Sequence, residues 1–498
     1  MLNLVKEIRK INDPHLLYDW VKSVLVFDLL AILIGVLGGI LIIKINQPVY
    51  ILLGLIFIGV FGSSIFYVDF GLLVLVGLVY TRVSDALNHD YGIPSVLQIY
   101  IVLLFCGILG RWVLYREMPK GWIKGGALFS LYGLVCIVSL FIASDASVTM
   151  TALNNLLKDA IIMILVLVLL RKGTSFQQVV WMLIGVGIFL GTISCIQFLT
   201  KTFTNTYGGF ASARIMEISG TTDDYRIGGP VSDANYFALI MVVIVILALE
   251  RFLHEHRSFY RFIALWGLIV TLLCVVFSYS RGGFISLLAA LTIFFFIYPP
   301  RFFQVPIIIM SLIAISFFLP PKYFDRIFSL NQFFHRTQPG EIQTNDSSFR
   351  DRAAQNLVAY EMIKSNPLFG IGLSNYRTDF NIYASRLGVS IGGLASAHNL
   401  YLEVAAETGF LGLFTFIALI TNSLRITWKS YSAFLRAGNF EYAGMAIAFG
   451  IGFFGYLVGS IFIHGAYPRY FYLLVGIGYS LENVVREMLN IKGFRKYP

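Results

Sequence analysis

The sequence predicts an all-α fold, a polytopic membrane bundle of about 14 transmembrane helices with a long, partly helical loop outside the membrane. First, 57% of the 498 residues are hydrophobic and 13% are charged, whereas soluble domains are roughly half apolar and a quarter charged. Second, the apolar residues lie in runs of about 20, the length that an α-helix needs to cross the hydrocarbon core. Third, the loops between these runs alternate between basic and nearly uncharged, which indicates alternating sides of a membrane.

The apolar runs place the predicted spans in chain order. The candidates are residues 24–43, 49–67, 69–84, 95–114, 122–143, 151–170, 176–199, 233–250, 260–279, 282–299, 303–320, 399–424, 440–463 and 467–485. The two candidates within 49–84 could instead form one broken span. The amino-terminal segment lacks the short apolar core and cleavage site of a signal peptide, so we expect the first span to remain as an anchor.

Basic residues give the predicted orientation. The short loops predicted inside carry basic residues, among them Arg116, Arg171, Arg257, Arg301 and Lys429, whereas the short loops predicted outside carry few, such as Lys44. Positive loops beside membrane spans mark the cytoplasmic side. We therefore expect an even number of spans with both termini in the cytoplasm.

Two segments predicted outside are long, 200–232 and 321–398. Long loops in compact proteins are usually functional or disordered. Ala354, Leu357, Val358 and Met362 recur at helical spacing, which predicts an amphipathic helix over the outer end of the bundle. Asn366-Pro367 should end that helix. We divide the chain into amino-terminal spans (1–200), a core with the long loop (201–425) and carboxy-terminal spans with a short tail (426–498).

Composition and motifs exclude several classes of function. The net charge of +10 does not indicate nucleic-acid binding, because most basic residues lie in short loops beside spans. The four cysteines all fall within apolar runs and show no metal-binding spacing. The sequence contains no P-loop, no dinucleotide-binding glycine motif and no Asp-x-Asp pair. An enzyme of this sequence is expected to work without a metal, nucleotide or other cofactor.

Two arginines at the predicted outer face are candidate phosphate ligands. Arg281 lies in a tight turn between two spans and precedes Gly282-Gly283, and Arg226 lies just before the span that starts near residue 233. Arginine grips phosphate in bidentate fashion, and an arginine near membrane depth is by default functional. The alternative for both is an interfacial arginine that reaches toward lipid headgroups.

A histidine directly before the span at 399–424 and two glutamates in its first turns are further candidates. His398 is a candidate general base, since an unperturbed imidazole accepts a proton near neutral pH; the alternative is a structural histidine at the helix end. Glu403 and Glu407 lie one turn apart in the apolar run. We expect each to pair with an arginine of a neighbouring helix, and the alternative is a role as proton carriers in a transporter.

Four motifs occur in order along residues 220–415: R-x-G-G-P-x-x-D-A-N-Y from Arg226, S-R-G-G from Ser280, R-x13-N-P-L-F-G-I-G from Arg352, and H-N-L-Y-L-E-x-x-A-E-T-G-F-L-G from His398. Together they resemble the O-antigen ligase and polymerase family. Outside this region the resemblance lies only in the many-spanning architecture.

The resemblance implies a metal-independent, inverting membrane glycosyltransferase that uses a glycan linked through diphosphate to undecaprenol. Arg281 and Arg226 would hold the diphosphate and stabilise the leaving group, and His398 would activate the attacking hydroxyl. Arg352 would line the glycan cleft. Asn399 and Tyr401, within the motif of His398, would contribute to substrate binding.

Three functions follow from these observations. The preferred one is a surface-polysaccharide polymerase, because ligases that decorate lipid A have fewer spans. The second is a ligase that passes a finished glycan to another acceptor, and the third is a transporter or flippase. The polar residues concentrate at one face and in the second half of the chain, which favours an enzyme. Expected partners are donor and acceptor glycolipids, membrane lipids, and the flippase and chain-length regulator of the pathway, but no nucleic acid.

Overall fold

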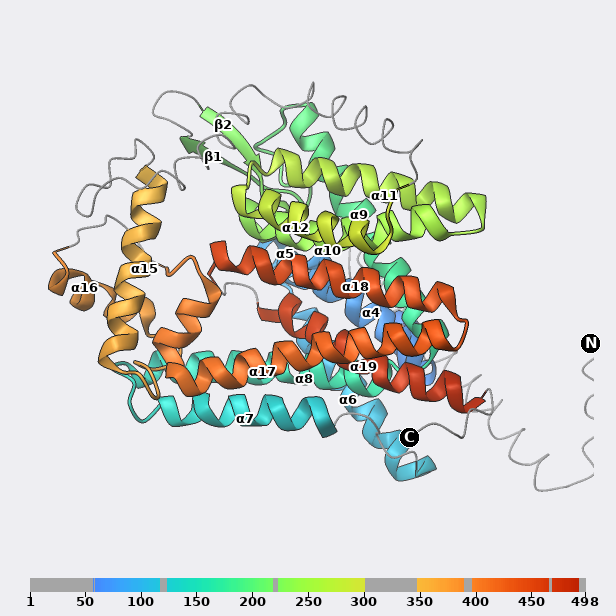
Figure 1. Cartoon of the computed structure of the whole chain (residues 1–498), viewed down its shortest axis with the longest axis horizontal. Helices are drawn as coiled ribbons and strands as arrows, with labels where there is room; N and C mark the ends of the chain where they lie inside the picture. Colours follow the sequence, from blue (N-terminus) through green and yellow to red (C-terminus); the bar gives the residue numbers. More distant parts are fainter. Residues whose placement is uncertain are drawn as a thin grey trace, which may run out of the picture. The chain divides into compact units, whose positions relative to one another are not determined.

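The computed structural model describes residue 57 and residues 59–116, 123–217, 223–300, 347–388, 396–464 and 468–491. The chain divides into two units, Met1–Tyr67 and Val68–Pro498. All the helices and strands labelled in Figure 1 belong to the second unit.

Eleven helices coincide with predicted spans. They are α4 (Val68–Thr81), α6 (Val96–Tyr115), α7 (Ile123–Ser139), α8 (Ala146–Leu169), α9 (Gly173–Leu199), α10 (Ala234–His254), α11 (Ser258–Phe277), α12 (Arg281–Ile297), α17 (Leu400–Arg436), α18 (Phe440–Gly459) and α19 (Pro468–Ile491). The all-α membrane fold class is confirmed. The predicted spans at 24–43 and 303–320, and about half of that at 49–67, lie outside the described residues.

Seven of the helices in the described part of the chain are long and apolar enough to cross a membrane. The number rises to eight if α4 and α5 (Val83–Tyr91), which meet at a bend of 56°, form one broken span. This bend lies at the end of the candidate span 69–84, so whether 49–67 and 69–84 form one broken span remains a prediction. Helices α7 and α12 are apolar but shorter. The total of about 14 spans remains a prediction from the lengths of the apolar runs.

Helix α10 forms the centre of the bundle. It is apolar on every side and almost entirely buried from Tyr236 to Ala248, as expected for a helix surrounded by others. Helices α9, α11, α12 and α18 pack around it. Its amino-terminal residues are therefore held firmly at one end of the bundle.

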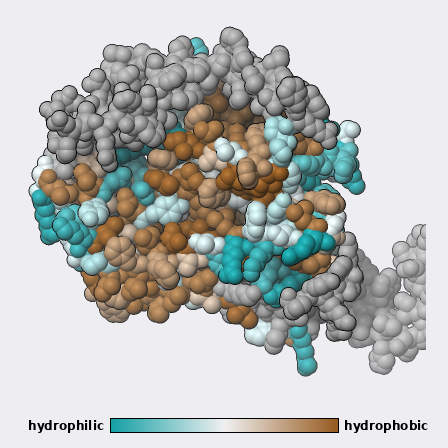
Figure 2. Space-filling model, viewed as in Figure 1, coloured by the Kyte–Doolittle hydropathy of each residue, from teal (hydrophilic) through white to brown (hydrophobic). Residues whose placement is uncertain are grey.

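The described part of the face seen in Figure 2 is largely apolar, with more polar residues gathered toward its left and right sides. Large apolar side chains are exposed to the surroundings, among them Phe296 (86%), Phe414 (74%) and Val113 (74%). A continuous apolar surface of this kind is unsuited to water and suits contact with lipid.

The long loop contains two helices, α15 (Ser347–Ser365) and α16 (Tyr376–Arg386), which lie at one end of the long helices in Figure 1. Helix α15 ends directly before Asn366-Pro367, as predicted. Val358 and Met362 are fully buried against α16 and the start of α17. The prediction for Leu357 was wrong, since this side chain is 52% exposed; the buried face turns toward Ala359 and Ile363 instead.

A two-stranded antiparallel hairpin, absent from the predicted fold, lies in the segment 200–232. Strands β1 (Ala213–Glu217) and β2 (Asp223–Ile227) place Arg214 opposite Arg226. A short 3₁₀ turn, η1 (Gly229–Val231), then leads into α10. The hairpin thus positions Arg226 close to the start of α10, the central helix.

Candidate active site

Helix α17 is broken at Gly409, whose φ of 69° and ψ of −172° are not helical. The short piece before the break pairs with the N-P-L-F-G-I-G stretch that follows α15. Phe410 N–H donates to the Pro367 carbonyl (2.7 Å), and Gly372 N–H donates to the Glu407 carbonyl (3.0 Å). The break frees backbone groups that must find partners, and this stretch supplies them. The N-P-L-F-G-I-G motif after α15 and the motif that begins at His398 therefore form one structural unit.

The H-N-L-Y motif forms the start of α17. His398 has a φ of 46°, in the left-handed region that non-glycine residues seldom adopt. The Asn399 side-chain oxygen caps the helix, accepting from the N–H groups of Tyr401 (3.1 Å) and Leu402 (3.2 Å). The Tyr401 hydroxyl donates to the Leu457 carbonyl of α18 (2.8 Å). Asn399 and Tyr401 fix the position of His398, and their predicted contact with substrate remains a prediction.

His398 lies against a second histidine that the sequence reasoning missed. The rings of His398 and His464 meet edge to face, with centroids 5.3 Å apart and planes at 87°. Burial, the Arg352 guanidinium and the His464 ring together lower the pKa of His398 to about 4, although Asp233 opposes the shift. Burial also lowers the pKa of His464. Both rings are therefore neutral near pH 7, the state in which an imidazole accepts a proton.

Arg226 is 2% exposed and holds the hairpin to the turn before α12. Its Nε donates to the Ser278 carbonyl (2.7 Å), and Nη2 donates to the Asn235 side-chain oxygen (2.9 Å). The Ser280 hydroxyl donates to the same Asn235 oxygen (2.9 Å). Arg226 therefore helps to shape the turn that carries Arg281, in addition to its predicted role toward the diphosphate.

Arg281 is the first residue of α12, after the helix cap formed by Ser280, which accepts from Gly283 N–H (3.1 Å). The two glycines that follow allow close packing: a Cβ on Gly282 would lie 2.9 Å from the Cβ of Phe462. Phe462 ends the short turn η4 (Ser460–Phe462), two residues before His464. The beginning of α12 therefore lies beside the segment that carries the second histidine.

The start of α10 lies between two groups of predicted site residues. The first group is Arg226 and the turn that carries Arg281, and the second is His398 and Arg352. Asn235 binds Arg226, next to the turn of Arg281. Asp233, which caps α10 by accepting from Tyr236 N–H, acts electrostatically on both His398 and His464. The structure thus places Arg226 beside the Arg281 turn and His398 beside Arg352, with the amino terminus of α10 between the two groups.

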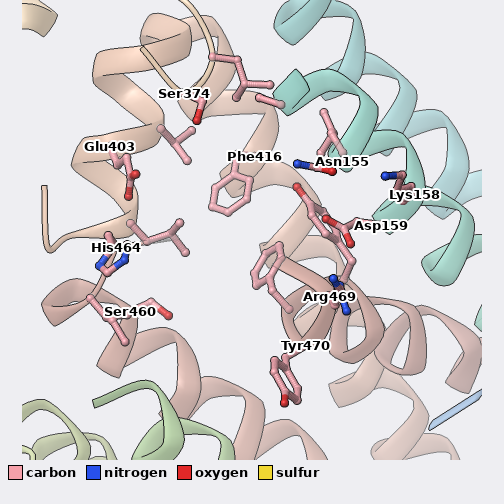
Figure 3. A pocket seen from close by; sticks show the side chains of 18 of the residues that line it. Asn155, Lys158, Asp159, Ser374, Glu403, Phe416, Ser460, His464, Arg469 and Tyr470 are labelled. Atoms are coloured by element: carbon pink, nitrogen blue, oxygen red, sulfur yellow. The ribbon is translucent and has the colours of Figure 1, made fainter. Parts of the chain in front are cut away.

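A cavity of about 580 Å³ lies next to these groups. His464 lines it, whereas Arg226, Arg281, Arg352 and His398 are not among the described residues of its wall. The other charged residues of the wall are Arg82, Lys158, Asp159, Arg377, Glu403, Glu407 and Arg469. Figure 3 shows Asn155, Lys158, Asp159 and Arg469 on one side and Glu403 and His464 on the other. A cavity of this size is typical of a small-molecule site.

Glu407 is buried and accepts hydrogen bonds from the backbone N–H groups of Tyr376 (3.3 Å) and Ser374. Arg377 acts on it electrostatically and donates to the Ser396 hydroxyl (2.7 Å). The expected arginine is therefore close, but backbone groups of the loop before α16 provide the hydrogen bonds. Glu407 ties the long loop to α17.

Lys158 and Asp159 were also missed as site residues, although they stand in the middle of an apolar run. Charged residues inside a span are a recognisable signal of function. Because they lie in the first half of the chain, the argument that polar residues concentrate in the second half was incomplete. The cavity draws its wall from α8 and α19 as well as from the predicted core 201–425.

Among the described residues, no group of three or more His, Cys, Asp or Glu side chains could hold a metal ion. The charged side chains of the cavity instead mix cations with carboxylates. Arginine, lysine and neutral histidine can bind anions and move protons by themselves.

Part of the site lies in a segment that is similar to a known family. Residues 266–417 match the family model described as O-antigen ligase. The match includes Arg281, Arg352 and His398, and it leaves Arg226 and His464 outside. No curated protein matches the chain. The resemblance drawn from the four motifs is thereby confirmed, and residues 266–417 are similar to the O-antigen ligase family.

Proposed function

We propose that this protein is a polysaccharide polymerase, which transfers a growing glycan from undecaprenyl diphosphate to a hydroxyl of a lipid-linked repeat unit. The observation that carries the proposal is the edge-to-face contact of His398 with His464, a residue of the cavity wall, together with the electrostatic action of Arg352 on His398. The family match supports lipid-linked glycans as the substrates.

In this proposal the reaction is a single displacement at the sugar carbon that bears the diphosphate. His398 takes the proton from the acceptor hydroxyl as its oxygen attacks. A new carbon–oxygen bond forms, the bond to the diphosphate oxygen breaks, and the anomeric configuration inverts. Arg281 stabilises the negative charge that develops on the leaving undecaprenyl diphosphate, and Arg226 supports both that arginine and the donor. Preorganised cations at a site of growing charge are often the largest catalytic contribution.

The proposal places the enzyme in the bacterial inner membrane with both termini in the cytoplasm and the site at the outer face. The charge of the loops supports this orientation. A flippase that delivers the repeat units and a regulator of chain length are the partners that such a reaction needs. The core 201–425 would carry the chemistry, with α8 and α19 completing the cavity.

A ligase is the second candidate, because the matching family model is described as O-antigen ligase. The chemistry at His398 and Arg281 would be the same, and the acceptor would differ. The transporter is disfavoured by the family match.

Complementation of a null strain tests the proposal. We expect wild-type protein to restore polymer, and His398→Ala or Arg281→Ala protein to insert in the membrane without restoring it. Accumulation of single lipid-linked repeats in those cells would identify a polymerase, and accumulation of full-length lipid-linked polymer would identify a ligase. Normal chain lengths with both variants would refute the enzymatic proposal.

A further inference from the structure

We propose that the α8 side of the cavity, formed by Asn155, Lys158 and Asp159, is a subsite that binds sugar hydroxyls of the lipid-linked glycan. The inference rests on the proposed function, which supplies the glycan as ligand. It assigns a task to residues that neither the four motifs nor the family match include.

The position of the two charged residues along α8 is the first argument. Lys158 lies 12 residues after Ala146 and 11 before Leu169, the ends of the helix. At a rise of about 1.5 Å per residue, both ends are roughly 16–18 Å away, so Lys158 and Asp159 stand near the middle of a span. Charges at that depth are costly and by default mark a functional site.

The second argument is that these side chains face the cavity without a hydrogen bond to the described part of the protein. Asp159 is 4% exposed, and it lines the cavity together with Asn155 and Lys158. Arg469 and Lys158 act on Asp159 electrostatically. Within the described part of the chain, however, the three side chains make no hydrogen bond or ion pair with the protein. A buried carboxylate without a hydrogen-bond donor is unfavourable, so a ligand that donates hydrogen bonds would stabilise it.

The chemistry of the three groups selects a polyol over a diphosphate. The Asp159 carboxylate accepts hydrogen bonds, the Lys158 ammonium donates them, and the Asn155 amide does both. A diphosphate only accepts hydrogen bonds and therefore could not donate one to the Asp159 carboxylate. A sugar presents hydroxyls that donate and accept. The rings of Tyr132 and Phe416 also line the cavity and supply apolar surface for the carbon face of a sugar.

The placement of the subsite agrees with the proposed reaction. Figure 3 shows Asn155, Lys158 and Asp159 projecting from α8 on the side of the cavity opposite His464, which touches the ring of His398. A glycan held along α8 would therefore extend toward the histidine pair. The diphosphate would lie with Arg281, outside the described wall of the cavity.

Binding to the full-length protein in lipid nanodiscs tests the subsite. The probes are the repeat-unit glycan released by mild acid from the glycolipid of the null strain, and farnesyl diphosphate as a short lipid diphosphate. We expect Asp159→Asn and Asn155→Ala each to weaken glycan binding about tenfold, the effect of losing one strong hydrogen bond, and to leave farnesyl diphosphate binding unchanged. Asn154→Ala is the matched control, because Asn154 is the exposed neighbour of Asn155 on the same helix and is not part of the cavity wall.

Wild-type glycan affinity in both variants would overturn the inference. A loss of farnesyl diphosphate binding with glycan binding retained would also overturn it, because that result would indicate an anion site. The His398→Ala protein separates this test from that of the proposed function. It should bind the glycan normally while forming no polymer. Polymer formation by His398→Ala would refute the proposed function. The subsite is tested separately, by glycan binding to the Asp159→Asn and Asn155→Ala proteins.

Discussion

Gly370 and Gly409 face each other across the break in α17. A Cβ on Gly370 would overlap the backbone of Glu407, and a Cβ on Gly409 would overlap the backbone of Leu368. Both glycines also have a φ of 69°, which other residues adopt only with strain. The loop after α15 and the start of α17 can pair only because both positions lack a side chain. This pairing holds the segment that carries His398.

Substituting either glycine by alanine should therefore destabilise the protein by about 3 kcal/mol or more, since two backbones would have to separate. Thermal unfolding of the purified protein in detergent, followed by loss of the monodisperse peak, measures the effect. Gly388→Ala is the control: Gly388 has a φ of 66° but open space around it, so it should cost only the backbone strain of about 1–2 kcal/mol. Equal losses at all three positions would show that the pairing adds nothing.

The pH dependence of the rate should reflect the lowered pKa of His398. Because burial and Arg352 hold the pKa at about 4, the neutral, base-competent form persists well below the usual value near 6.5. We expect kcat/KM to stay constant from neutral pH down to about pH 5 and to fall only in more acidic solution, since kcat/KM reports the free enzyme. An acid limb near pH 6.5 in the wild-type protein would contradict the described environment of His398.

Removing the Arg352 guanidinium should move the acid limb of the rate profile to higher pH. The cation disfavours protonation of His398, so Arg352→Ala should raise the pKa and shift the fall in rate toward higher pH, whatever its effect on the maximum rate. Lys364→Ala, which removes an exposed cation from the last turn of the same helix, should leave the limb in place. Identical pH profiles for wild type and Arg352→Ala would count against the electrostatic coupling.

Arg226 and Asn235 should be coupled energetically. Their hydrogen bond is 2.9 Å long and joins the hairpin to α10. A double-mutant cycle with Arg226→Ala and Asn235→Ala, measured by denaturant titration in mixed micelles, should give a coupling free energy of about 1–2 kcal/mol. Arg214→Ala is the control because Arg214 lies opposite Arg226 in the hairpin and is exposed. A coupling near zero would show that Arg226 does not organise the turn before Arg281.

Arg251 should be essential for stability and not for chemistry. It is fully buried and donates to both oxygens of Glu250 (2.6 and 2.9 Å) and to Glu441 (3.1 Å), which joins α10 to α18. Arg251→Ala would leave Glu250 buried without its cation, at a cost of about 3–5 kcal/mol. Thermal unfolding should show the loss, and Arg257→Ala, at an exposed position, should not. An unchanged unfolding temperature would refute the structural role.

Much of the helical architecture was predictable because a membrane demands long apolar runs. The boundaries of α9 and α12 lie within a few residues of the predicted spans, and α15 ends where Asn366-Pro367 predicts. The hairpin was not predictable, because its two strands are short and polar. The break at Gly409 was also missed, since one glycine in an apolar helix costs little by itself and its partner lies in a distant loop.

The candidate site was predictable where a motif marks it and not where partners meet through space. His398 was identified from its position before a span. His464 belongs to no such pattern, and only the packing of η4 against α17 brings it to His398. Lys158 and Asp159 were detectable as charges within a span. The cavity that they line was not predictable, because its wall combines helices from both ends of the chain.

The most direct test of the central claim uses the purified protein in nanodiscs with lipid-linked repeat units extracted from the null strain. We expect the wild-type protein to produce a ladder of longer glycans and to release undecaprenyl diphosphate. His398→Ala and Arg281→Ala should each be at least about 100-fold slower, the usual effect of removing a catalytic base or a charge-stabilising donor, with Asn154→Ala as active as wild type. Elongation by the His398→Ala protein at the wild-type rate would contradict the claim that this histidine activates the acceptor hydroxyl.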